Sequence, residues 1–256
     1  MTEAQIRKHH GKPVLFINDV PQFPTAFISY LPEQFRYKNM ADAGIHFFSF
    51  SVALGERWVN CTKEQVKFPR EGLWRGPDEL DLTGLDKCIR EIVEVDKTAW
   101  IFPRIYCDSP EWWDGLYPAE LNILADGTPL RHSFSSVLWR QETGKILKQV
   151  VNFIAQSPYR DRIIGYHLTA GGTEECAHNC LGNLRGDYSP CAERRFKEWL
   201  RAKYGPQDST AFKLFGKGIE EITIPSLAVR QQGNYGNFLD PIKSRVVIEY
   251  HQFYSA

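Results

Sequence analysis

Residues 98–108 of the chain read TAWIFPRIYCD, and this stretch decides the fold. Its nearly continuous apolar character is typical of a strand that is buried on both faces of a parallel sheet. Only Arg104 interrupts the apolar run before the strand ends at Asp108. Because an unpaired buried charge is unfavourable, Arg104 needs a partner. The sequence therefore predicts either a bound carboxylate or hydroxyl group at Arg104, or an ion pair inside the sheet.

Strand and helix patterns alternate on both sides of this stretch. Alternation of this kind implies a parallel sheet with right-handed crossovers. Long loops follow the strands and the joins from helix to strand are short, as in a barrel whose functional face lies at the carboxyl ends of its strands. We therefore predict an α/β fold: a partial (β/α)8 TIM barrel of about the first four β/α units, in a single domain over residues 1–256. The predicted strands are 12–18, 45–52, 98–108 and 161–170, and the predicted helices are 32–44, 82–96, 135–157, 191–205 and 241–256.

The composition excludes several classes of protein. Basic and acidic side chains balance, with 31 of each in 256 residues, so nothing indicates nucleic acid or an acidic membrane surface as a partner. No apolar run approaches the roughly 20 residues that span a bilayer. The start, MTEAQIRKHHGKP, lacks the apolar core of a signal peptide, and we expect a cytoplasmic location. Aromatic residues make up 13% of the chain, and they either line a ligand cleft or fill the core.

Polar and aromatic side chains follow each predicted strand. The carboxyl ends of parallel strands meet at one rim, so these side chains can converge on a site, although loops begin with polar residues in any case. The stretch AGGTEE at 170–175 ends on two glutamates, which form either a solvated acidic turn or a catalytic acid at the mouth of the barrel. Neighbouring side chains on an extended backbone point to opposite faces, so we expect only one glutamate to face the cleft. The candidate residues are Asn18, Arg104, Asp108, Trp112, Trp113, His167, Glu174 and Glu175.

Several segments resemble a known family in their order along the chain. GKPVLFINDVPQFP, MADAGIHFFSF, IYCDSPEWW, RIIGYHLTAGGTEE and FKEWLRAKYG follow one another as in glycoside hydrolase family 42, the β-galactosidase-like TIM barrels. The resemblance runs from about residue 11 to the end, and its most specific part is FKEWLRAKYG, the helix after the fourth strand. It implies that the chain is the N-terminal part of such a catalytic domain.

The resemblance implies a retaining glycosidase that cleaves terminal β-linked sugars with two carboxylates. Glu175 matches the acid/base position, and Glu174, the reserve choice, stands where the family has Asn. The family's nucleophile is a glutamate of the seventh strand, so we expect it to be absent from this chain, a fragment with at most weak hydrolase activity. The altered loop and the missing second carboxylate leave an alternative, a non-catalytic carbohydrate-binding or degenerate barrel protein. The predicted sugar-binding residues are Arg104, Asp108, Trp112, Trp113, His167 and Asn18.

Four cysteines form a candidate metal site. Cys107 ends the third strand, and Cys176, Cys180 and Cys191 follow the fourth, so adjacent strand ends can bring four thiolates into a closed tetrahedral zinc site. Some family 42 members carry a structural cysteine-bound zinc in this region, whereas free thiols are the alternative. We expect catalysis itself to require no cofactor. Because half a barrel leaves open strand edges, we also expect pairing with a second copy, a homo-oligomer, or with the missing half.

Overall fold

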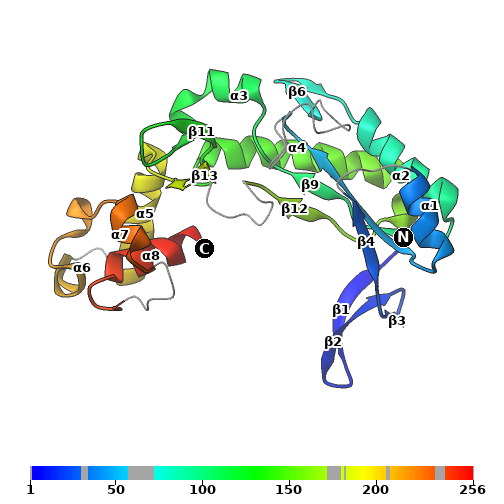
Figure 1. The fold of residues 1–256 in the computed structure, drawn as a ribbon, viewed down its shortest axis with the longest axis horizontal. Coiled ribbons are helices and arrows are strands. Elements are labelled where there is room, and N and C mark those ends of the chain that lie inside the picture. Colours follow the sequence, from blue (N-terminus) through cyan, green and yellow to red (C-terminus); the bar gives the residue numbers. More distant parts are fainter. Residues whose placement is uncertain are drawn as a thin grey trace. The chain divides into compact units, whose positions relative to one another are not determined.

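The computed structural model describes residues 2–29, 34–56, 72–171, 180–181, 183–205, 208–233 and 240–255 (Figure 1). They form two compact units. The sheet unit comprises residues 1–115 and 141–177, and the helical unit comprises residues 116–140 and 178–256. A single domain over residues 1–256 stays a prediction. Within the described segments, no helix combines the length and the apolar character that crossing a membrane requires.

A parallel sheet is the centre of the sheet unit. Its strands lie in the order β12 (His167–Thr169), β9 (Arg104–Tyr106), β5 (Phe47–Ala53) and β4 (Ala26–Ser29), and the short β8 (Trp100–Ile101) also pairs with β5. Every pair in this sheet is parallel. Three of the predicted strands coincide with β5, β9 and β12. The predicted α/β fold with a parallel sheet is confirmed.

The segment KPVLFIN does not form the first barrel strand that the sequence predicts. Its residues form β2 (Lys12–Ile17), the middle strand of an antiparallel sheet with β1 (Ala4–His9) and β3 (Val20–Gln22). Asn18 and Asp19 make the turn into β3, with positive φ angles of 48° and 65°. Such angles match the twist of a two-residue hairpin. A short apolar run does not reveal whether its neighbour is parallel, so the prediction was wrong here and β4 is the first parallel strand.

Helices pack on the apolar face of the parallel sheet. The helices of the sheet unit are α1 (Gln34–Asp42), α2 (Thr83–Val95), α3 (Glu111–Leu116), which follows β9, and most of α4 (Val137–Gln156). The short η2 (Arg160–Arg162) and the hairpin of β6 (Trp74–Gly76) and β7 (Glu79–Leu80) complete the unit. The ring of Tyr37 in α1 lies 6.1 Å from that of Phe27 and 5.9 Å from that of Phe48. α2 buries the apolar stripe that its helical spacing predicts. The short α3 lies in a stretch that the sequence analysis leaves as a loop.

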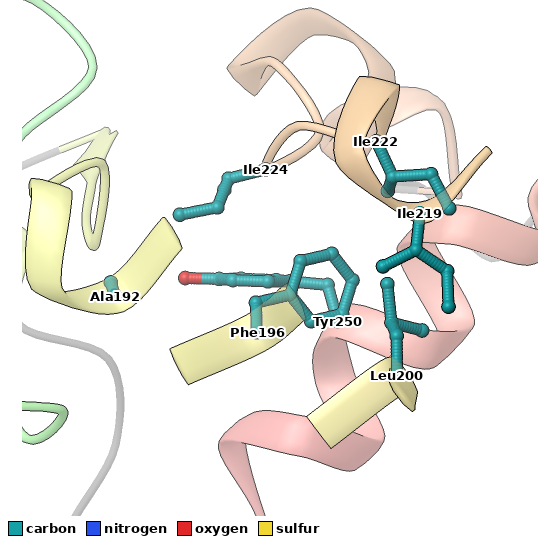
Figure 2. Packing of buried hydrophobic residues seen from close by; sticks show 7 residues of the cluster. All are labelled: Ala192, Phe196, Leu200, Ile219, Ile222, Ile224 and Tyr250. Carbon is teal, nitrogen blue, oxygen red and sulfur yellow. The ribbon is translucent and has the colours of Figure 1, made fainter. Parts of the chain in front are cut away.

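The helical unit packs around one apolar cluster, shown in Figure 2. Phe196 and Tyr250 lie at its centre, with their ring centroids 5.5 Å apart. The predicted end of the 191–205 helix is confirmed, because Gly205 adopts a φ of 85° directly after it. The elements are η1 (Pro118–Glu120), β10 (Leu121–Ile123), β11 (Pro129–His132), β13 (Cys180–Leu181), β14 (Leu184–Arg185), α5 (Pro190–Tyr204), α6 (Asp208–Phe215), η3 (Ile219–Glu221), α7 (Leu227–Arg230), η4 (Gln231–Gly233) and α8 (Arg245–Tyr254).

Candidate active site at the ends of the parallel strands

Three neighbouring strands place Ser51, Arg104 and His167 side by side. Arg104 of β9 is in register with Ser51 of β5 on one side and with His167 of β12 on the other. Residues in register in a parallel sheet project from the same face. Arg104 donates a hydrogen bond from Nε to Nδ1 of His167 over 3.2 Å. With Nδ1 accepting, the neutral imidazole carries its proton on Nε2.

The two faces of the parallel sheet differ in chemistry. Arg104 and His167 are half-buried, whereas the other members of the polar face are buried. Ser49 donates from Oγ to the carbonyl oxygen of Phe102 over 2.7 Å, which fixes its hydroxyl. The opposite face carries Phe48, Phe50, Val52 and Ile105, each 0% exposed. The polar face consists of Ser49, Ser51, Arg104, Tyr106, His167 and Thr169.

Asp108 connects the end of β9 to the end of β12. Its side chain is fully buried, and Oδ1 accepts a hydrogen bond from the amide of Gly171 over 3.0 Å. Gly171 has a φ of 86°, which only glycine adopts readily. Asp108 therefore fixes the backbone at Gly171, three residues before Glu174, and its buried side chain is not an open sugar contact. Both glutamates, Glu174 and Glu175, lie outside the described residues.

The two predicted sugar-binding tryptophans have different surroundings. Trp113 is 0% exposed and donates from Nε1 to Oε2 of Glu142 over 2.6 Å. A ring with no exposed surface cannot stack on a sugar, so Trp113 is a packing residue and its prediction as a wall of the sugar pocket was wrong. Trp112 is half-buried, with its ring edge-on to Trp74 at a centroid distance of 5.1 Å. Its Nε1 donates to the carbonyl oxygen of Trp74 over 3.1 Å.

Asn18 does not lie at the end of a parallel strand. It belongs to the exposed turn between β2 and β3, where Oδ1 accepts a hydrogen bond from the amide of Glu3 over 3.0 Å. Its own amide donates to the carbonyl oxygen of Glu3 over 2.9 Å. These bonds close the end of the hairpin. The prediction of a sugar-binding role for Asn18 depended on the misplaced first strand and was wrong for the same reason.

Only two of the four cysteines of the predicted zinc site have side chains within the described part of the chain. Cys107 is buried in the sheet unit, with Sγ 3.6 Å from the carbonyl oxygen of Ile105. Cys191 is buried in the helical unit, where Sγ lies 3.1 Å from Oγ of Ser189. The side chains of Cys176 and Cys180 lie outside the described part of the chain. No group of three His, Cys, Asp or Glu side chains in that part could hold a metal ion, so the residues in view do not make a zinc site by themselves.

Sequence reasoning missed two members of this region. Tyr106 lies in the row after Arg104, between Ala53 and Thr169, and Trp74 packs on Trp112. The two-residue period of a strand could have assigned Tyr106 to the same face as Arg104.

Cys88 does not belong to the site but to the core, because burial raises the pKa of its thiol to about 12 and keeps it protonated.

Comparison with known proteins finds a fold that resembles this one. No protein-family model matches the sequence, and no curated protein matches it. The chain is similar to the crystal structure of a cold-adapted β-galactosidase from Rahnella sp. R3, with a TM-score of 0.56 and 16% identity. The fold is β-galactosidase-like. The match covers 91% of this chain and 34% of that one, so the chain spans about one third of the length of the β-galactosidase.

Proposed function

We propose that this chain carries the acid/base half of a retaining β-galactosidase-like glycosidase of family 42. The observation that carries the proposal is the row of Ser51, Arg104 and His167 across three parallel strands, in a fold similar to that of a β-galactosidase. Barrel enzymes build their sites from the ends of several strands, because one strand cannot surround a substrate. The ordered segments that resemble family 42 agree with this fold.

In this proposal, Glu175 protonates the leaving oxygen and then activates the water that releases the sugar. Its loop starts at Gly171, where the buried carboxylate of Asp108 holds the backbone. Arg104 and the Nε2 proton of His167 bind hydroxyl groups of the terminal sugar. In the family that the chain resembles, the attacking carboxylate belongs to the seventh strand, and no residue of this chain is assigned that role. The chain alone is therefore expected to bind a β-galactoside without turning it over at a substantial rate.

A basic sugar tests the acid/base assignment without turnover. In β-galactosylamine, a basic nitrogen replaces the oxygen that the catalytic acid would protonate. Its protonated form should make a charge-assisted hydrogen bond to Glu175. Such bonds are about twice as strong as neutral ones. We expect Glu175→Gln to weaken binding of β-galactosylamine by about ten-fold or more, as measured by isothermal titration calorimetry.

Two controls make this experiment decisive. Galactose carries no positive charge, so its affinity should change little in Glu175→Gln. The matched variant Glu174→Gln changes the neighbouring carboxylate and should keep the affinity for β-galactosylamine. Equal losses in the two variants, or a loss in Glu174→Gln alone, would contradict the assignment of Glu175. If neither substitution distinguishes the amine from galactose, the non-catalytic carbohydrate-binding alternative holds.

A further inference from the structure

A cleft of about 430 Å³ lies wholly within the helical unit. This volume is in the range of small-molecule sites. α5 supplies one wall, because its lining residues follow the spacing i, i+3, i+4, i+7 and so share one helix face. The end of α8, the start of α4 and the residues before α4 supply the rest. The lining residues are Phe134, Ser135, Arg140, Arg195, Glu198, Trp199, Ala202, Phe253 and Tyr254.

The aromatic side chains of this cleft are held from behind. Trp199 and Phe253 pack against the core cluster of Figure 2, and their ring centroids lie 6.3 Å apart. Phe134 meets Tyr254 edge-on at 5.9 Å and Trp139 at 5.7 Å. All four lining rings are half-buried, so each is anchored and still contributes surface. A ligand ring can therefore pack on this wall with little ordering of side chains on binding.

The charges of the cleft are not balanced. Arg195 pairs with Glu198, with Nη1 3.1 Å from Oε2. The described residues offer Arg140 no side-chain hydrogen bond or ion pair. Burial and then the nearby guanidinium of Arg195 lower the pKa of Arg140. Lys203, one position after Ala202 of the lining, is already paired with Glu249 over 2.5 Å. The two guanidinium groups and the one carboxylate of the cleft thus leave one net positive charge next to the aromatic wall for a ligand.

We propose that this cleft binds an acidic sugar, a hexuronate unit of a polysaccharide. The apolar face of the sugar ring packs on the aromatic wall, and its carboxylate pairs with Arg140 and Arg195. Arginine suits this role because its planar fork of donors matches the two oxygens of a carboxylate. A neutral sugar would not pair with the charge of Arg140, and an inorganic anion would not cover the aromatic wall.

A second cleft of the helical unit separates the contributions of charge and aromatic surface. Its volume is about 380 Å³, and Tyr188 is the one aromatic ring that lines it. Lys197 pairs with Glu193, and Arg201 pairs with Glu220, which leaves Arg194 as its surplus cation. The two clefts therefore carry the same excess charge but differ in aromatic surface. Arg194 and Arg195 are neighbours on α5, and they serve as a matched pair for substitution.

The test is calorimetric titration of the whole chain with sodium galacturonate, galactose and sodium acetate. We expect galacturonate to bind more tightly than either of the others, because only galacturonate offers both the ring and the charge. Arg140→Gln and Arg195→Gln should each weaken galacturonate binding by about ten-fold. Arg194→Gln should leave it unchanged. None of the three side chains is fully buried, and circular dichroism checks that the variants fold.

Several outcomes would overturn the proposal. Equal affinities for acetate and galacturonate would show that the aromatic wall does not contribute. An equal loss in Arg194→Gln and Arg195→Gln would show a general effect of charge. The proposed glycosidase site is tested separately, because Arg104→Ala should weaken galactose binding and leave galacturonate binding intact. Failure of one proposal therefore leaves the other standing.

Discussion

Two sets of polar side chains, one in each unit, have opposite surroundings. In the sheet unit, Arg104 and His167 are half-buried on one face of a sheet, and Arg104 donates a hydrogen bond to His167 across the strands. In the helical unit, Asp187 is 4% exposed and surrounded by donors. Its oxygens accept hydrogen bonds from the amide of Ser189 over 2.9 Å, from the amide of Ile123 over 3.4 Å and from the hydroxyl of Ser133.

This difference separates groups that are placed for a ligand from groups that hold the fold. Removal of a buried acceptor leaves each of its donors without a partner, and every orphaned donor lowers stability. A half-buried side chain at a sheet face leaves donors and acceptors that water can reach. Substitution of Arg104 or His167 should therefore change stability little, whereas substitution of Asp187 should lower it.

The largest expected effect comes from emptying the core of one unit and measuring whether the other unit is destabilised as well. Phe196→Ala empties the centre of the helical core and should lower its free energy of unfolding by about 3–5 kcal/mol. Amide hydrogen exchange should then accelerate in α5 and α8 but not in β5 and β9. The matched variant Phe50→Ala should do the reverse, because Phe50 is fully buried in the sheet unit. Loss of protection throughout the chain in both variants would show that the units unfold as one.

The next effect concerns the buried carboxylate. Asp187→Ala orphans three donors and should lower the free energy of unfolding by about 3 kcal/mol or more. Arg104→Ala and His167→Ala should each lower it by less than about 1 kcal/mol, since both side chains are partly exposed. Urea unfolding of the three variants measures the contrast. Similar values for all three would remove the distinction between the units.

The smallest effect is a difference in pH dependence. Burial raises the pKa of Asp187, and hydrogen bonds from Ser133 and Ser189 only partly offset it. Burial also raises the pKa of Asp96, but hydrogen bonds from Thr98 and His46 outweigh it, so the net shift is downward from 3.8. Asp96 therefore stabilises the fold above its unfolded pKa and loses this contribution as pH falls. Asp187 contributes most below its unfolded pKa and loses stability as pH rises through the raised value.

Asparagine variants, which cannot titrate, reveal how each carboxylate makes the unfolding free energy depend on pH. We expect Asp187→Asn to remove a fall in unfolding free energy as pH rises from about 4. Asp96→Asn should remove a rise in unfolding free energy over the acid range just below that pH. Urea midpoints measured in steps of pH, relative to the unmodified chain, give both results. Slopes of the same sign for the two carboxylates would contradict the opposite shifts.

The sequence predicted the segments of β5, β9 and β12 but not β4. Unbroken apolar runs are typical of buried strands. The prediction failed where the same signal has two meanings. KPVLFIN is as apolar as a barrel strand, yet the Asn18–Asp19 turn folds the chain back as a hairpin. The local two-residue turn determined the pairing, and the apolar pattern alone did not contain that information.

Side-chain roles at the site were harder to predict than strands. Trp112 and Trp113 are adjacent in sequence, but one is half-buried and the other is enclosed. Composition cannot separate a ligand-facing ring from a core ring, because burial depends on which helix packs above it. Arg104 was recognised because a charged residue within an apolar strand needs a partner. The pattern around Arg104 did not identify that partner, because His167 lies 63 residues further along the chain.

Two faces of α5 have different roles. Ala192, Phe196 and Leu200 face the core, whereas Arg195, Glu198 and Ala202 line the cleft. Core packing and the proposed recognition thus depend largely on different residues of one helix, and Trp199 takes part in both. Natural selection could retune what the cleft accepts by exchanging the outer face while the inner face stays constant. Among relatives of this chain, variation that alternates along α5 with helical period would record that freedom.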